Sequence, residues 1–123
     1  MQSEAFLNAL KQGLDDKKGL DIQVIDLRER TMFTDFFLLA TGTSSTHVAA
    51  MANEVDRVAT THRVNVLGTE GMGEASWVLL DLGDVVVHLF QSQTRSFFNL
   101  EKLWSPKTML LTTPESVSLA MEG

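Results

Sequence analysis

The chain has 123 residues, of which 44% are hydrophobic and 21% charged, and this composition fits one globular domain with a single core. Acidic residues outnumber basic ones by 16 to 10, and the resulting net charge of −6 disfavours direct nucleic-acid binding. The absence of cysteine excludes disulfides, thiolate nucleophiles and cysteine-based zinc sites. Because an acidic domain is steered toward positive charge, the expected partner is a protein surface rich in lysine and arginine.

The sequence contains no apolar run long enough to span a membrane and no signal peptide, so we expect a cytoplasmic protein. Its three histidines, His47, His62 and His88, do not have the spacing that places two metal ligands on one helix face. We therefore expect neither a metal nor another cofactor.

The first half of the chain predicts a helix, two strands and a second helix. Apolar residues at helical spacing predict a helix over 4–18, ended by Gly19. Alternation in DIQVIDL predicts a strand over 21–27, and the continuous apolar run TDFFLLA predicts a strand over 34–40 that is buried on both faces. Capping candidates in TSST and an apolar stripe predict a second helix over about 45–62.

The second half predicts three further strands and a third helix. Residues 64–69 form a short strand, and the segment GEASWVLLDLGDVVVHLF, residues 73–90, supplies a hairpin. A third helix is predicted to begin at Ser92 and to end before Pro106. We therefore expect residues 1–105 to form a single α/β domain and 106–123 a loose C-terminal extension. This succession predicts an α/β fold with one mixed β-sheet of about five strands packed with helices. Such a sheet has exposed edges, and pairing between two copies at an edge would give a homodimer.

The hairpin is expected to gather polar and aromatic side chains on one face, because side chains alternate along a strand. A turn at Leu82 and Gly83 places Asp81 opposite Asp84. The same register then places Leu79 opposite Val86 and Trp77 opposite His88. The residues on this face are Trp77, Leu79 and Asp81 in the first strand and Asp84, Val86 and His88 in the second. A three-residue loop with Gly83 left-handed is the alternative, and it would shift the pairing.

Two interpretations of this face remain open. Facing carboxylates repel each other and require a basic partner or water, and a tryptophan with flanking acids is typical of an interface anchor with a polar rim. Aspartate is also common at turns, and tryptophan is commonly buried, so Trp77 can equally belong to the core.

The segment Gly42–Ser45 lies between a predicted strand and helix, where nucleophile elbows and phosphate-binding helix starts occur. It lacks the second glycine of an elbow and the lysine of a phosphate loop, so helix capping is the default interpretation. A nucleotide- or phosphate-binding module remains the alternative function. Asp81 and Asp84 do not have the D-x-D spacing of a catalytic metal pair on one strand.

Several motifs resemble, in order and spacing, the ribosomal silencing factor family, also called Iojap-like. They are TDFFLLATGTSSTHVAAMANEV, LGTEG and SWVLLDLGDVVVHLF, followed by Arg95, Phe97, Phe98 and LEKLW. The resemblance covers about residues 2–105. Position 98 is often tyrosine in the family and is phenylalanine here.

The resemblance implies a fold similar to the nucleotidyltransferase superfamily without its catalysis, and therefore no enzyme. It implies binding to ribosomal protein L-fourteen of the large subunit, which blocks joining of the small subunit and lowers translation when nutrients are scarce. An acidic sheet face with Trp77 at its centre suits such a basic partner. The predicted partner-binding residues are Glu70, Trp77, Leu79, Asp81, Asp84, Val86, His88 and Arg95.

Overall fold

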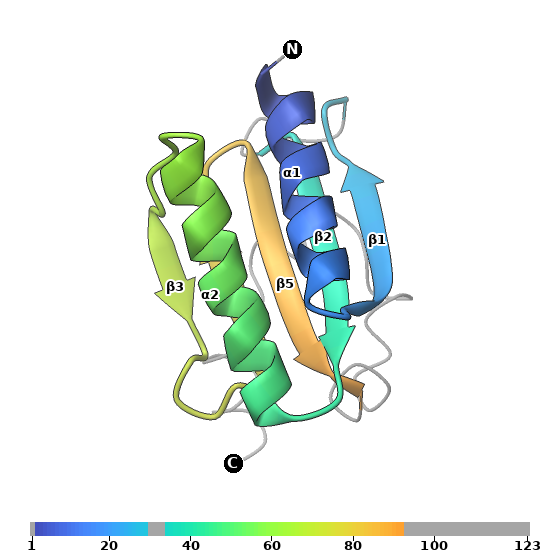
Figure 1. Cartoon of the computed structure of the whole chain (residues 1–123). Coiled ribbons are helices and arrows are strands. Elements are labelled where there is room, and N and C mark those ends of the chain that lie inside the picture. The colour runs from blue at the N-terminus through green and yellow to red at the C-terminus, as the bar shows by residue number, and fades with distance from the viewer. Residues whose placement is uncertain (1, 30–33, 93–123) are drawn as a thin grey trace, which may run out of the picture.

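The computed structural model describes residues 2–29 and 34–92, which form one five-stranded mixed sheet with two helices against it (Figure 1). The helices are α1 (Gln2–Asp16) and α2 (Ser45–Thr61). The strands are β1 (Leu20–Asp26), β2 (Phe36–Gly42), β3 (Gly68–Glu70), β4 (Trp77–Asp81) and β5 (Val85–Gln91). The third helix predicted from Ser92 and the predicted extension over 106–123 lie outside the described residues.

The strands lie in the order β1-β2-β5-β4-β3, so the sheet is mixed as the sequence predicts. β2 and β5 run parallel, and the other neighbouring pairs are antiparallel. Every residue of β2 is buried, which confirms the prediction of a strand covered on both faces. The short strand β3 forms one edge of the sheet, and β1 forms the other (Figure 1).

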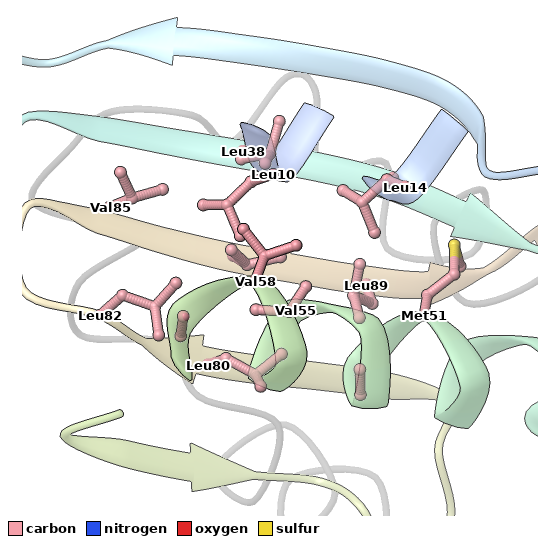
Figure 2. Close-up of a cluster of buried hydrophobic side chains, with 14 of the residues drawn as sticks. Leu10, Leu14, Leu38, Met51, Val55, Val58, Leu80, Leu82, Val85 and Leu89 are labelled. Carbon is pink, nitrogen blue, oxygen red and sulfur yellow. The ribbon is translucent and has the colours of Figure 1, made fainter. Parts of the chain in front are cut away.

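Helices α1 and α2 lie side by side on the same face of the sheet, and the main core fills the space between the two layers (Figures 1 and 2). Figure 2 shows side chains of both helices pointing at those of β2, β4 and β5. The largest fully buried members of this core are Leu10, Leu14, Leu38, Met51, Leu80 and Leu89. Each buried leucine stabilises the fold by about 1.5–3 kcal/mol relative to an exposed one, so this core is a main source of stability.

Both helices end in a Schellman motif with a basic residue in the left-handed conformation. In α1 that residue is Lys18, with φ 62°, and Gly19 N–H donates to Leu14 O at 2.8 Å. In α2 it is Arg63, with φ 57°, and Val64 N–H donates to Ala59 O at 2.8 Å. The left-handed position after α1 is thus one residue earlier than Gly19, the glycine from which the sequence predicted the stop.

The prediction of a strand over 64–69 is only partly correct. The left-handed Arg63 turns the chain, and ladder pairing begins at Gly68, so β3 has only three residues. Leu67 N–H donates to Asp81 O at 2.7 Å, which ties the approach to β3 against the end of β4. The residues just before β3 therefore run along the surface, with Leu67 largely exposed.

Candidate functional site

The turn between β4 and β5 differs by one residue from the predicted turn. Gly83 and Asp84 occupy its two central positions, and Leu82 N–H donates to Val85 O at 2.9 Å across it. Gly83 has φ 84°, the positive value that this type of two-residue hairpin turn requires at its first central position. The predicted turn would have placed Leu82 in that strained conformation, and the observed turn avoids it.

The pairing of the hairpin shifts accordingly by two residues. Asp81 lies opposite Val86, and Leu79 lies opposite His88. The predicted pairs Asp81–Asp84, Leu79–Val86 and Trp77–His88 are therefore wrong, and Asp84 is in the turn itself. Because a shift of two residues preserves the alternation of side chains, the strand residues still share one face, as predicted.

That face is turned away from α1 and α2, and it carries a second buried cluster. Its members are Leu27, Phe37, Leu39, Trp77, Val86 and Phe90, with Ile25 and Leu79 partly buried beside them. The Trp77 side chain is only 2% exposed, and its ring stacks on Phe90 with centroids 5.4 Å apart. Trp77, Val86 and His88 are thus buried in this structure, and their role as partner contacts stays a prediction.

His88 is fully buried in the second cluster and hydrogen-bonded to tryptophan. The Trp77 Nε1–H group donates to His88 Nδ1 at 3.2 Å, and the Phe37 ring meets the imidazole edge-on at 4.9 Å. Since Nδ1 accepts, a neutral ring carries its proton on Nε2, and Nε2 has no hydrogen-bond partner within 2–29 and 34–92. Burial lowers the pKa of His88 to about 3, so the ring is neutral at physiological pH.

The accessible part of the predicted site lies at the turn. The half-buried Asp81 accepts the Gly83 N–H through Oδ1 at 2.9 Å, and Asp84 is exposed. The Asp84 carbonyl accepts N–H groups of Asp35 at 2.9 Å and Phe36 at 3.0 Å, which fixes the turn to the start of β2. These hydrogen bonds hold the backbone beneath two carboxylates in one arrangement.

The other predicted contacts are spread more widely. Leu79 and Glu70 are partly buried and lie opposite each other in the β3–β4 ladder. Arg95 lies outside the described residues, so its role stays a prediction. The structure thus brings Asp81 and Asp84 together at the turn, with Glu70 at the other end of β3 from Leu67.

Leu67 is a surface residue that the sequence does not single out. Leu67 is 68% exposed, and its Cδ1 lies 3.7 Å from the position that a Cβ would take on Gly83. Leu67 therefore lies beside the turn that carries Asp84. The sequence places Leu67 in the strand predicted over 64–69. No local pattern distinguishes it from an ordinary apolar residue of a strand.

The predicted alternative site, Gly42–Ser45, is used for helix capping. Ser44 Oγ accepts the His47 N–H at 3.1 Å, so Ser44 is the N-cap of α2. His47 Nδ1 in turn accepts the Thr43 N–H at 2.9 Å. These contacts confirm the default interpretation and engage two of the amides that a phosphate would otherwise use.

Gly42 is required for packing between β2 and α2. A Cβ at this position would lie 2.8 Å from Val48 Cγ2 and 3.0 Å from Met51 Cε. The glycine thus permits close approach of helix and strand. This packing is enough to explain why position 42 is a glycine. Over the described ranges, no group of three or more histidine, aspartate or glutamate side chains could hold a metal ion.

Comparison with known proteins identifies the family. Residues 1–121 match the family described as "Ribosomal silencing factor during starvation". The chain belongs to the ribosomal silencing factor family. The family match reaches beyond residue 105, where the resemblance of the individual motifs ended, and it includes most of the predicted extension.

Proteins from a bacterium and from a plant are similar to this chain. It is 41% identical to ribosomal silencing factor RsfS of Bacillus subtilis, over 85% of this chain and 88% of that protein. It is 32% identical to the chloroplastic protein Iojap of Zea mays, over 85% of this chain but 45% of that protein. Two solved structures of similar chains also share the fold.

The first is a protein from Bacillus halodurans, with a TM-score of 0.75 and 39% identity, covering 82% of this chain and 94% of that one. The second, from Chromobacterium violaceum, has a TM-score of 0.80 and 35% identity, covering 85% of this chain and 87% of that one. Similar chains from two bacteria thus share this arrangement of sheet and helices. Among the described helices, none is long and apolar enough to cross a membrane.

Proposed function

We propose that this chain binds the large ribosomal subunit through ribosomal protein L-fourteen and thereby prevents the small subunit from joining. Bound there, it represses translation in the cytoplasm when nutrients are limiting, and it acts by occupying space without catalysing a reaction. The observation that carries the proposal is membership of the ribosomal silencing factor family over residues 1–121.

The charge of the chain supports a basic protein partner. With a net charge of −6, the molecule is repelled by RNA phosphates and attracted to lysine- and arginine-rich surfaces. At the β4–β5 turn, Asp81 and Asp84 lie on a backbone that is already fixed by hydrogen bonds. Acidic residues on a fixed backbone lose less freedom on binding than residues of a mobile loop, which favours affinity for a matching set of basic groups.

Sedimentation with separated ribosomal subunits tests the proposal. The purified chain should sediment with the large subunit and not with the small one, and its prior binding should reduce formation of whole ribosomes. Binding should also weaken as salt is added, because the attraction between opposite charges is screened. Equal sedimentation with both subunits, or undiminished joining at saturating factor, would contradict the proposal.

Direct binding to purified ribosomal protein L-fourteen tests the identity of the partner. The wild-type chain should form a complex with it in the absence of ribosomal RNA. Binding to the large subunit without binding to this protein would retain the silencing role and assign the contact to another part of the subunit.

A further inference from the structure

Exposed apolar side chains gather around the edge strand β3. The large hydrophobic residues that are exposed in the described part of the chain are Leu67 (68%), Leu20 (46%), Met72 (40%) and Val66 (36%). Three of the four lie within a few positions of β3 in the sequence, and Leu67 is the most exposed of all. Single exposed apolar residues are ordinary, but a local group of them marks an interaction surface more often than chance.

Leu67 is held in a defined position. Its N–H donates to Asp81 O at 2.7 Å, and its side chain lies against Gly83, which has no side chain of its own. The leucine therefore projects beside the β4–β5 turn from a backbone already bonded to β4. A side chain on such a backbone has less freedom to lose when a partner covers it.

Two acidic residues belong to the hairpin turn that Leu67 contacts. Asp81 supplies the carbonyl that holds the Leu67 N–H and the Oδ1 that holds the Gly83 N–H, and Asp84 is the exposed second residue of the turn. The group formed by Val66, Leu67, Asp81 and Asp84 is called here the turn patch. An apolar centre with charged groups at its border is the common arrangement of a protein interface.

We propose that the turn patch is the surface on which this chain docks, with Leu67 as its apolar anchor in place of the buried Trp77. This inference rests on the proposed function, and it commits to one occupant, a basic protein surface of the large subunit. That surface should offer an apolar hollow for Leu67 bordered by lysine or arginine side chains that pair with Asp81 and Asp84.

Charge argues for this occupant over the two others that an exposed apolar patch suggests. Two copies meeting through the turn patch would bring the carboxylates of Asp81 and Asp84 against identical carboxylates, and each copy carries a net charge of −6. RNA would place phosphates against the same groups. A basic protein surface alone turns both carboxylates into favourable contacts.

The test compares Leu67→Ser with Leu20→Ser, a matched change at an exposed leucine on β1, the opposite edge of the sheet. Affinity is measured for the large subunit and for purified ribosomal protein L-fourteen. Leu67→Ser should weaken both by roughly 30-fold, the loss expected when a hot-spot side chain is truncated. Leu20→Ser should change either affinity by less than about twofold, as for a residue outside the interface.

A second variant, Leu67→Lys, covers the case in which serine disturbs the loop. It keeps an aliphatic stem and places a positive charge against the basic partner, so it should weaken binding at least as much as Leu67→Ser. Because Leu67 is exposed, both variants should unfold within a few degrees of the wild-type midpoint, checked by thermal denaturation. Normal binding by a folded Leu67→Lys protein would overturn the inference.

The outcomes separate this inference from the proposed function. A wild-type chain that fails to bind the large subunit refutes the proposed function and with it the docking assignment. A wild-type chain that binds, together with Leu67 variants that bind equally well, refutes the turn patch and leaves the proposed function standing.

Two further measurements identify a different occupant. If sedimentation of the free chain shows a dimer that Leu67→Ser dissociates while ribosome binding is unchanged, the turn patch joins two copies. If Leu67-dependent binding is retained on large-subunit RNA stripped of protein, the occupant is RNA. Either result would overturn the assignment to a basic protein surface.

Discussion

Acidification should destabilise this protein through His88. The ring is fully buried and its pKa is lowered to about 3, whereas an unfolded chain titrates histidine near 6.5. Between these two values the unfolded state binds one proton more than the folded state. The free energy of unfolding therefore falls as the pH falls through this interval, and the stability is fully present only above the unfolded value.

The size of the effect follows from the same difference. A pKa difference of one unit corresponds to about 1.4 kcal/mol, so lowering the pH from 7.5 to 5.5 should remove about 1 kcal/mol of stability through this residue. Glu54 does not contribute to the loss of stability between pH 7.5 and 5.5. Its hydrogen bond with Arg57 lowers the pKa of the carboxyl below its ordinary 4.5, so its stabilisation is lost only at lower pH.

The perturbation is His88→Leu, which removes the titrating group and its Nε2 atom, for which the described part of the chain offers no hydrogen-bond partner. The change also leaves the Trp77 indole N–H without its acceptor, so the absolute stability of the variant is not the diagnostic quantity. The diagnostic quantity is the pH dependence. Because His47 and His62 are present in both proteins, the difference between the two pH profiles isolates position 88.

Urea unfolding at pH 7.5, 6.5 and 5.5 measures this difference, and all three values lie above the isoelectric point of about 4.9. Far-ultraviolet circular dichroism is the suitable signal, since tryptophan fluorescence would respond directly to the titrating neighbour of Trp77. Wild type should lose about 1 kcal/mol more than His88→Leu between the highest and lowest pH. Parallel pH profiles would refute a buried, neutral His88.

Four other changes test separate parts of the structure. Trp77→Ala should lower the free energy of unfolding by about 3–5 kcal/mol in urea titrations, and an unchanged stability would contradict the burial of Trp77. Lys18→Gly should raise the thermal midpoint, with a gain of about 0.5–1 kcal/mol from relief of the left-handed conformation, whereas Lys18→Ala should bring no such gain. Gly42→Ala should cost about 1–3 kcal/mol in thermal unfolding, because its Cβ would meet Val48; a neutral result would contradict the packing of α2 on β2. Asp84→Asn should weaken large-subunit binding by a few-fold and flatten its salt dependence, and Asp56→Asn on α2, which removes the same charge elsewhere, should do neither.

The sequence by itself determined the elements and their order along the described chain. Helical spacing predicted α1 and α2, and the unbroken apolar run over 34–40 predicted a central strand buried on both faces. These features depend on which residues lie within a few positions of one another, and that information is local. The family could be identified for a related reason, since its motifs are continuous stretches of sequence.

Only the tertiary structure decided which of these residues a partner can reach. The alternation in β4 and β5 placed Trp77 and His88 on one face, but whether that face is open depends on packing from distant parts of the chain. The shift of the turn by one residue moved Asp84 out of the ladder, because a glycine tolerates the positive φ that Leu82 would not.

The exposure of Leu67 was decided in the same way. Its hydrogen bond to Asp81 and its contact with Gly83 join residues that are far apart in the sequence, and neither is visible in the local pattern of the sequence. Local periodicity fixes which side of a strand a residue is on, whereas burial is a property of the assembled layers.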